Sequence, residues 1–199
     1  MMKHQTQILI ATKNTGKVRE LEELLKSSPF ILRSLNEFPH LADVEETGAT
    51  FAENAFLKAK EYASQTKIRS LADDSGLEVS ALGNIPGVFS ARYAGENATD
   101  AKKIAKLLNA LKEKDDRNAR FVCAMAIADE AGEIIFSAEG ICCGEIALKP
   151  SGTNGFGYDS IFVPRGFNQS FGELSDEIKR KISHRARAIE KIIRFLHDF

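Results

Sequence analysis

The chain has 199 residues, of which 43% are hydrophobic and 28% charged, and its formal net charge is −1. Such a composition is ordinary for a soluble globular protein, and so small a net charge gives the whole molecule no electrostatic attraction to DNA or to anionic membranes. No apolar run approaches the roughly 18 residues that a membrane-spanning helix needs. The polar start MMKHQTQ and the short apolar run after it also predict that there is no signal peptide. We therefore expect a cytoplasmic protein.

The three cysteines include the adjacent pair Cys142 and Cys143, and no CxxC spacing occurs. This pattern argues against a disulfide framework and against a zinc site. It favours reduced, half-buried thiols.

Apolar runs alternate with helical spacings along the chain. Strands are predicted over 7–12, 30–35, 68–73, 119–128, 133–141 and 160–163. Helices are predicted after the Asn14-Thr15-Gly16 sequence, after the capping-box sequence Thr50-Phe51-Ala52-Glu53, after Thr99-Asp100, and over 175–196. A hairpin among alternating strands and helices predicts a mixed α/β sheet. With no repeat or linker, we expect a single bilobed domain over 1–199.

The loop Ala11-Thr12-Lys13-Asn14-Thr15-Gly16-Lys17 joins the first strand to the first helix. Backbone N–H groups at a helix N-terminus favour an anion, and a lysine in the first turn adds positive charge. The loop is not a Walker A motif, because the glycine spacing is missing and Val18 stands where the metal-binding Ser or Thr would be. It is either a phosphate site or a capped helix with an exposed lysine.

Two adjacent carboxylates, Asp73 and Asp74, end the apolar run in LADDSGL. Adjacent like charges repel and lose solvation when buried, so the pair requires open water or a cation. Because strand side chains alternate between two faces, both can face one site only if a turn begins there, and Ser75-Gly76 predicts that turn. One carboxylate would then enter a cleft, while the other would brace the turn or lie behind the first. Magnesium would balance the charge, with a further ligand from the acidic loop around Glu45-Glu46. The alternative is an Asx-type turn with solvated acids.

Two later segments can hold a planar ligand. In GTNGFGYD, glycines flank Phe156, so the backbone can approach a ligand on which the ring stacks, and Asp159 can accept hydrogen bonds. The alternative is an aromatic side chain that fills the core. The basic cluster around Lys179 and Arg187 is typical of a solvated helix face, but Ser183-His184-Arg185 interrupts the helical pattern with groups that can donate to a carbonyl.

Taken together and in this order, five segments closely resemble the inosine/xanthosine triphosphate pyrophosphatase family, whose members hydrolyse non-standard purine nucleoside triphosphates. The segments span nearly the whole chain and read ATKNTGKVRELEELL, EETGATFAENAFLKAKEYA, LADDSGLEVSALGNIPGVFSARYAG, GTNGFGYDSIFVP and FGELSDEIKRKISHRARA. The resemblance implies an α/β fold with a long, mixed, twisted β-sheet flanked by helices, in two lobes around a central cleft. It also implies magnesium as cofactor and a homodimer.

The resemblance assigns roles residue by residue. The triphosphate would be bound by Thr12, Lys13, Asn14, Thr15, Gly16 and Lys17, and Lys17 would also act in catalysis. Glu46 and Asp74 would be the magnesium-associated carboxylates, Asp74 would also be the general base, and Ser75 would touch the substrate. The base and sugar would be held by Phe156, Gly157, Tyr158 and Asp159, with Phe156 stacking. The purine would be recognised by Lys179, His184 and Arg185.

These assignments define a hypothesis for the reaction. Water attacks the α-phosphorus of ITP, dITP or XTP, and pyrophosphate leaves. Inosine and xanthosine carry a 6-oxo acceptor where adenosine carries a 6-amino donor, so a site lined with donors leaves adenine with unpaired groups. Each such buried group costs about 1–3 kcal/mol. Two or three would give discrimination on the order of 10²–10⁴-fold.

Three alternatives remain open at this point. The protein can be a pyrophosphatase for another modified nucleotide, or a nucleotide sensor without turnover. A nucleic-acid-binding module using the basic C-terminal helix is the third, and the net charge and the lack of interleaved aromatics count against it. We expect no nucleic-acid or membrane partner.

Overall fold

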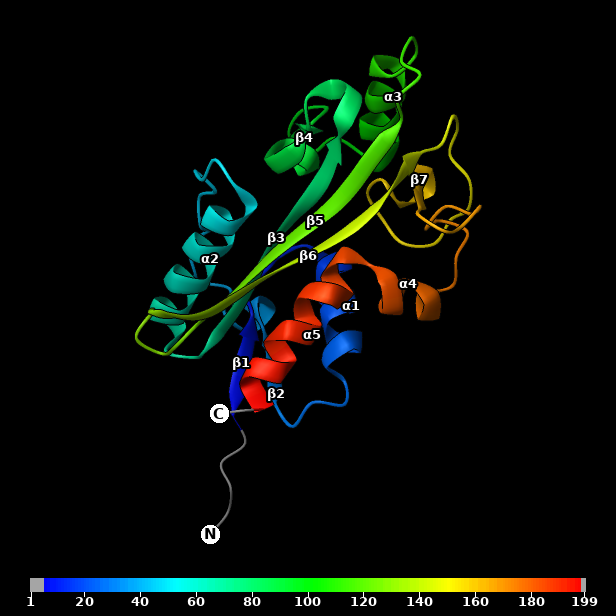
Figure 1. Ribbon diagram of the computed structural model, residues 1–199. Coiled ribbons are helices and arrows are strands. Elements are labelled where there is room, and N and C mark those ends of the chain that lie inside the picture. Colours follow the sequence, from blue (N-terminus) through cyan, green and yellow to red (C-terminus); the bar gives the residue numbers. More distant parts are fainter. Residues whose placement is uncertain (1–5, 198–199) are drawn as a thin grey trace. The chain divides into compact units, whose positions relative to one another are not determined.

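A computed structural model describes residues 6–197, and Figure 1 shows how strands and helices follow one another along the chain. The first five residues of the polar start lie outside the described range. The strands are β1 (Gln7–Ile10), β2 (Ile31–Ser34), β3 (Ser70–Val79), β4 (Ile85–Pro86), β5 (Asn118–Ala128), β6 (Ile134–Ile146) and β7 (Phe162–Pro164). The helices are α1 (Thr15–Leu25), α2 (Phe51–Thr66), α3 (Asp100–Ala110), α4 (Asp176–Ile182) and α5 (His184–His197).

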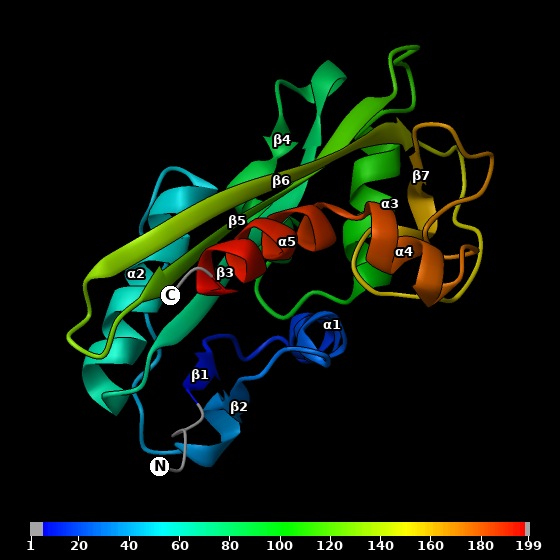
Figure 2. The same cartoon turned by 60° about the horizontal axis from the view of Figure 1, so that its bottom comes forward.

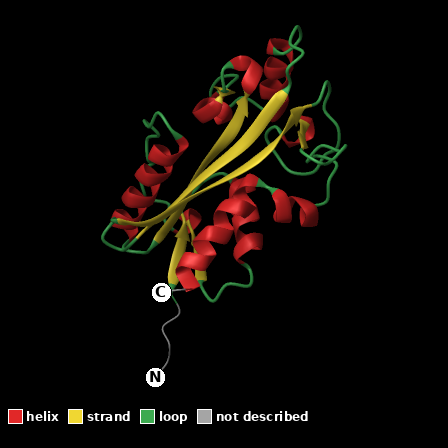
Figure 3. Ribbon diagram, in the orientation of Figure 1, coloured by secondary structure: helices red, strands yellow, loops and turns green. Residues whose placement is uncertain are grey.

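The strands form one seven-stranded mixed sheet in the order β2-β1-β3-β5-β6-β7, with β4 paired to β3 (Figure 3). Strand β1 runs parallel to both β2 and β3. The pairs β3–β4 and β6–β7 are antiparallel. Parallel neighbours require helical crossovers and antiparallel neighbours do not, which matches the alternating first part of the chain and the hairpin after it. The predicted mixed α/β sheet flanked by helices is confirmed.

The chain divides into two compact units. Unit 1 contains the chain up to Asp74, together with Cys123–Glu139 and the chain from Ala188 onward. Unit 2 contains Ser75–Val122 and Gly140–Arg187. The long strands β3, β5 and β6 each contribute to both units. The description of 1–199 as a single bilobed domain stays a prediction.

Each unit has its own apolar core. In unit 1, strands β1, β3 and β5 bury apolar side chains together with those of α1 and α5, and β1 and β2 lie side by side (Figure 2). In unit 2, the core forms around the ring cluster of Phe121, Phe162 and Phe171 and the apolar stripe of α3. Tyr158, from the segment that the sequence predicts to hold the base, belongs to this core.

Strand β3 differs from the sequence prediction. The turn expected at Ser75-Gly76 is wrong, because β3 continues to Val79. Leu77 and Val79 are completely buried and continue the alternation of the strand. Residues Glu78 and Val79 also pair with β4, which holds the strand extended beyond Gly76. The two aspartates consequently lie inside a regular strand and not at its end.

The segment predicted to be helical over 175–196 contains two helices, and the break falls at the Ser183-His184-Arg185 sequence that interrupts the helical pattern. Ser183 has extended backbone angles (φ −67°, ψ 158°) and ends α4. Its hydroxyl accepts a hydrogen bond from the amide of Ala186 at 3.1 Å, so the same residue caps the start of α5. This break makes His184 the first residue of α5.

The capping box at the start of α2 is confirmed. The Thr50 hydroxyl accepts from the amide of Glu53 at 3.2 Å, and the Glu53 carboxylate accepts from the amide of Thr50 at 3.2 Å. Two N–H groups that an α-helix leaves unpaired at its start are satisfied in this way. Helix α2 therefore begins at a fixed residue, which sets the register of its polar side chains.

Replacing Thr50 with Ala is expected to lower the free energy of unfolding by about 1 kcal/mol, because the cap hydrogen bond is lost. Urea denaturation monitored by far-ultraviolet circular dichroism measures this change. Thr50→Ser keeps the hydroxyl and should stay close to the parent protein. Equal destabilisation by both replacements would show that the methyl group, not the cap, stabilises this turn.

No helix within residues 6–197 is long and apolar enough to span a membrane.

Candidate active site

The loop between β1 and α1 is organised by its own side chains. The Thr12 hydroxyl accepts from the amide of Asn14 at 3.2 Å, and the Asn14 side chain accepts from the amide of Lys17 at 3.1 Å. Asn14 is the N-cap of α1, and Thr15 and Gly16 are the first two helical residues. Backbone amides at this helix start favour an anion. The predicted loop residues thus form a compact phosphate-binding candidate.

Two lysines of this loop lie in different surroundings. Lys13 is more than half exposed and pairs with the exposed carboxylate of Asp43. The ammonium of Lys17 is nearly buried and lies 2.9 Å from Oδ1 of Asp73. The Lys17 side chain therefore points into the protein, whereas the Lys13 side chain makes its contact at the surface.

Asp73 is completely buried beside this lysine. Its second oxygen, Oδ2, lies 3.5 Å from the thiol of Cys123 on β5, which is also completely buried. A carboxylate without access to water needs such partners for its charge. Asp73 thereby fixes the orientation of the Lys17 side chain.

Asp74 has a separate set of partners from helix α2 and the acidic loop. Its Oδ1 accepts from the ammonium of Lys58 at 3.1 Å, and its Oδ2 accepts from the side-chain amide of Asn54 at 3.3 Å. The Lys58 ammonium also lies 2.6 Å from Oε1 of Glu46. One buried cation therefore joins the two carboxylates that the sequence predicts as metal ligands.

The protonation of this cluster follows from burial and charge. Burial raises the pKa of Asp74, and the nearby Lys58 and Lys17 offset only part of that effect. Burial lowers the pKa of Lys58, but Asp74 and Glu46 outweigh it, so the pKa lies above its usual value. Lys58 thus stays cationic, while Asp74 holds a proton more readily than an exposed aspartate.

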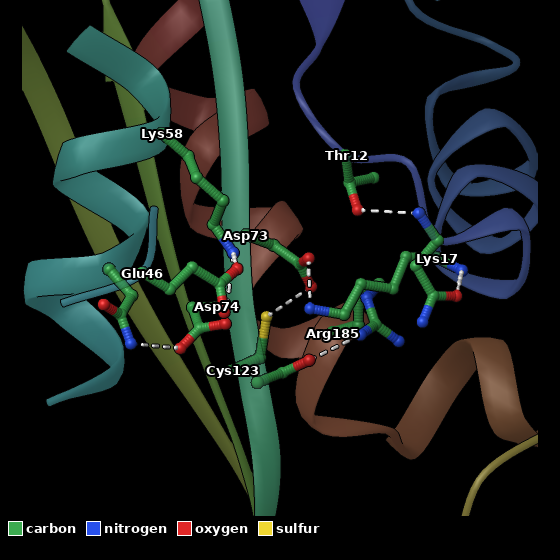
Figure 4. Close-up of polar contacts among 11 residues, drawn as sticks. Thr12, Lys17, Glu46, Lys58, Asp73, Asp74, Cys123 and Arg185 are labelled. Atoms are coloured by element: carbon green, nitrogen blue, oxygen red, sulfur yellow. Dashed lines mark hydrogen bonds and ion pairs between the residues drawn. The ribbon is translucent and has the colours of Figure 1, made fainter. Parts of the chain in front are cut away.

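Figure 4 shows that both carboxylates project from the same strand, β3. Asp73 points from β3 toward Lys17, whereas Asp74 points to the other side, toward Glu46 and Lys58. Successive strand residues face opposite sides of a sheet. The charges are therefore separated by the strand itself, and each carboxylate has its own lysine.

The donor set fits magnesium, although no group of three or more His, Cys, Asp and Glu side chains arranged to hold a metal occurs among residues 6–197. The carboxylates of Glu46 and Asp74 converge on a single nitrogen, so they already direct two oxygens toward one point. Magnesium needs one or two carboxylates when phosphate oxygens and water complete its shell. Glu46 and Asp74 would be the residues that hold it.

The predicted base-holding segment lies in unit 2 and is organised by Asp159. The Asp159 Oδ2 atom accepts from the amide of Phe156 at 2.8 Å and from the ammonium of Lys179 at 2.6 Å. Gly155 has a φ of +74°, and a Cβ there would collide with the Asp159 carboxylate. The glycine is thus required for this close approach.

Basic side chains from α4 and α5 surround the ring of Phe156. The Lys179 ammonium lies 5.2 Å from the ring centre, and the Arg185 guanidinium lies 5.9 Å from it. Arg185 is almost completely buried and donates to the hydroxyl of Ser75 at 2.8 Å. His184, also buried, stacks on Phe121 with ring centres 4.7 Å apart. Within unit 2, the structure brings Lys179 and Arg185 to the Phe156 ring, whereas the His184 ring lies on the core ring of Phe121.

The predicted residues divide between the two units. Unit 1 contains the phosphate and metal set, namely Thr12, Lys13, Asn14, Thr15, Gly16, Lys17, Glu46 and Asp74. Unit 2 contains Ser75, Phe156, Gly157, Tyr158, Asp159, Lys179, His184 and Arg185. Asp74 and Ser75 are adjacent in β3, so the division falls between two predicted site residues.

Sequence reasoning missed Lys58, Asn54 and Cys123 as partners of the two aspartates. A signal for the first two exists, because Asn54 and Lys58 are four residues apart on the apolar face of α2 and so share one side of the helix. Buried polar residues on a helix stripe need a partner. No comparable signal marks Cys123, because a cysteine in an apolar strand resembles any other core residue.

Comparison with known proteins identifies related sequences over nearly the whole chain. The model of the Ham1 family matches residues 8–195. A Bacillus licheniformis protein named dITP/XTP pyrophosphatase is 47% identical over 188 residues, which cover 94% of this chain and 95% of the relative. A protein of the same name from Desulforamulus reducens is 48% identical over 192 residues, covering 96% of this chain and 95% of the relative.

Solved structures of related proteins have the same fold. A HAM1 protein from Coxiella burnetii is 42% identical, with a TM-score of 0.89, and the match covers 98% of this chain and all of that one. A structure described as nucleoside-triphosphatase/dITP/XTP pyrophosphatase from Mycobacterium abscessus is 43% identical, with a TM-score of 0.76 and coverage of 96% and 100%. Matches of this extent confirm the family resemblance inferred from the sequence, and the chain belongs to the Ham1 family.

Proposed function

We propose that the protein hydrolyses non-standard purine nucleoside triphosphates, namely ITP, dITP and XTP, to the monophosphate and pyrophosphate. The observation that carries the proposal is the buried charge cluster of unit 1, in which Lys17 pairs with Asp73 and Lys58 joins Asp74 to Glu46. Lysines of this kind offset the charge of phosphate oxygens. The names of the relatives from Bacillus licheniformis and Desulforamulus reducens support the substrate class. The activity would remove damaged nucleotides from the precursor pool.

In the proposed reaction, a water oxygen attacks the α-phosphorus and the bond to the bridging oxygen of pyrophosphate breaks. Asp74 accepts a proton of the attacking water, and its contacts with Lys58 and Asn54 hold the carboxylate in one orientation. Lys17 and the amides at the start of α1 offset the negative charge that develops on the phosphate oxygens. Magnesium bound by Glu46 and Asp74 would add positive charge at the same oxygens.

Base selection would depend on unit 2. Phe156 would stack on the purine, and Lys179, His184 and Arg185 would present donors to its 6-oxo group. Lys179 is already paired with Asp159 and Arg185 with Ser75, so these donors are held in place before the nucleotide binds. An amino group at the 6-position would meet fixed donors, and a buried donor without a partner costs about 1–3 kcal/mol.

The proposal predicts pyrophosphate release from ITP, dITP and XTP that exceeds release from dATP by on the order of 10²–10⁴-fold in kcat/KM. A coupled pyrophosphate assay with the four nucleotides measures this ratio, and chelation with EDTA should abolish turnover until magnesium is added back. Equal turnover of dATP would contradict the base-selection argument. Binding of dITP without pyrophosphate release would instead support a nucleotide sensor, and turnover of a modified pyrimidine alone would support the other enzyme alternative.

The metal, the assembly and the location that we propose follow from the resemblance to the inosine/xanthosine triphosphate pyrophosphatase family. We propose magnesium as the metal, a homodimer as the assembly, and the cytoplasm as the location, with no nucleic-acid or membrane partner. The single bilobed domain over 1–199, with its cleft, belongs to this proposal. The net charge of −1 supports the absence of a nucleic-acid partner.

A further inference from the structure

Asp100 contacts the base-holding segment from a distant part of the sequence. The amide of Gly157 donates to Oδ2 of Asp100 at 2.7 Å, across 57 positions of the chain, and both residues belong to unit 2. Asp100 is the first residue of α3, and the helix is capped by Thr99. None of the roles assigned above includes this carboxylate.

The contact falls where the segment needs an external acceptor. Gly157 has a φ of +63°, in the left-handed region, and it lies in a turn outside the strands and helices. Its two neighbours are fixed by other groups: the Phe156 amide donates to Asp159, and the Tyr158 hydroxyl donates to the carbonyl of Ser90 at 3.0 Å. Three consecutive residues are thus held by three different partners, of which Asp159 lies in the same segment and Asp100 and Ser90 lie elsewhere in unit 2.

The charge of Asp100 is balanced on its other side. Its Oδ1 lies 2.6 Å from the ammonium of Lys103, one turn further along α3. Burial raises the pKa of Asp100, but the contacts with Lys103 and with the Gly157 amide outweigh it, and the pKa lies below its usual value. Each oxygen of an ionised carboxylate therefore has one partner, and hydrogen bonds of this charged kind are the stronger ones.

We propose that Asp100 is a positioning residue for nucleotide recognition, which holds the backbone at Gly157 so that Phe156 can stack on the base. The inference rests on the proposed function, because it concerns how that site binds its base. Asp100 itself does not touch the nucleotide. Its effect passes through one backbone amide and should therefore appear in substrate affinity and base preference, with little effect on the chemical step.

Three variants separate this role from its alternatives. Asp100→Ala removes the acceptor and should raise KM for dITP about 5–10-fold with kcat within about 2-fold, and should weaken the preference for dITP over dATP about 5-fold. Asp100→Asn keeps an acceptor oxygen but loses its charge, so it should raise KM for dITP by less than about 2-fold and keep most of the preference. Lys103→Met removes the ion pair but leaves the acceptor, and should also match the parent protein.

A merely structural role predicts a different pattern. If Asp100 acted through the ion pair or through the charge at the start of α3, Asp100→Asn and Lys103→Met would both reproduce the effect of Asp100→Ala. That pattern would overturn the inference, as would an Ala variant with unchanged KM and preference. Thermal unfolding of all three variants shows whether any loss of affinity accompanies a loss of fold.

Hydrogen exchange at the Gly157 amide tests the anchor without any turnover. By nuclear magnetic resonance, this amide should be protected in the parent, in Asp100→Asn and in Lys103→Met, and exchange at least about 10-fold faster in Asp100→Ala. Equal protection in the Ala variant would overturn the inference even if the enzyme is active. A parent protein that turns over no nucleotide would overturn the proposed function and the recognition role with it, while the exchange pattern would still decide whether Asp100 anchors the segment.

Discussion

Replacing Asp74 with Asn is expected to lower kcat for dITP by about 10³-fold or more, because a positioned general base contributes roughly 10²–10⁴-fold and the same change weakens a carboxylate that would hold magnesium. The Asn side chain has nearly the same shape, and its oxygen can still accept from Lys58. We therefore expect the fold to survive. Steady-state pyrophosphate release at saturating magnesium measures the loss, and circular dichroism verifies the fold.

Asp115 provides a matched control for this replacement. It is an exposed aspartate in the segment before β5, so Asp115→Asn changes the net charge of the protein equally but should leave kcat unchanged. A loss of activity below about 10-fold in Asp74→Asn would exclude Asp74 as the general base. Restoration of activity by raised magnesium concentration would indicate that its role is mainly that of a metal ligand.

Replacing Lys58 with Met should lower the free energy of unfolding by about 2–4 kcal/mol at neutral pH. Removing one member of a buried ion pair leaves an uncompensated charge and costs about 3–5 kcal/mol, and we reduce this figure because the Glu46 side chain is about one-third exposed to solvent. The cost should shrink as the pH falls, because a proton on Asp74 removes the uncompensated charge. Urea denaturation at neutral and at acidic pH measures both parts of the prediction.

Lys60 is the control for Lys58, since it lies on the same helix with its side chain exposed. Lys60→Met should change the free energy of unfolding by less than about 0.5 kcal/mol. If Glu46 and Asp74 hold magnesium, added magnesium should raise the melting temperature of Lys58→Met more than that of the parent. A variant as stable as the parent at neutral pH would show that the ion pair contributes no net stability.

Much of the fold could be predicted from local sequence patterns. The start of α2 at the Thr50 capping box and the mixed sheet followed from spacing alone, because caps and alternation are short-range properties. The continuation of β3 beyond Ser75-Gly76 could not be predicted in this way. A serine and a glycine usually mark a turn, but pairing with β4 and the burial of Leu77 and Val79 outweigh that local preference.

Only those parts of the candidate site that consist of consecutive residues could be predicted from the sequence. The Thr12–Lys17 loop and the GFGYD segment are such cases. The spacing of Asn54 and Lys58 on α2 marks two polar residues that need a partner, but it does not predict which partner, because the contact of Lys58 with Asp74 joins residues 16 positions apart on different elements. The interpretation that one aspartate enters the site while the other braces a turn depended on a turn at Ser75-Gly76, whereas the two side chains point to opposite sides of a continuous β3.

Asp73, Asp74 and Ser75 are consecutive in β3, so the side of the strand that each one faces depends on the number of residues before it. The proposed chemistry therefore depends on that number. Each of the three neighbours has a different partner, namely Lys17, Lys58 and Arg185. Deleting a single residue just upstream would turn every following side chain to the opposite face. Lys17 would then face Asp74 in place of Asp73, and Lys58 would face Ser75 in place of Asp74. A length change in this strand should therefore abolish function as completely as the loss of either aspartate, even when every functional side chain remains in the sequence.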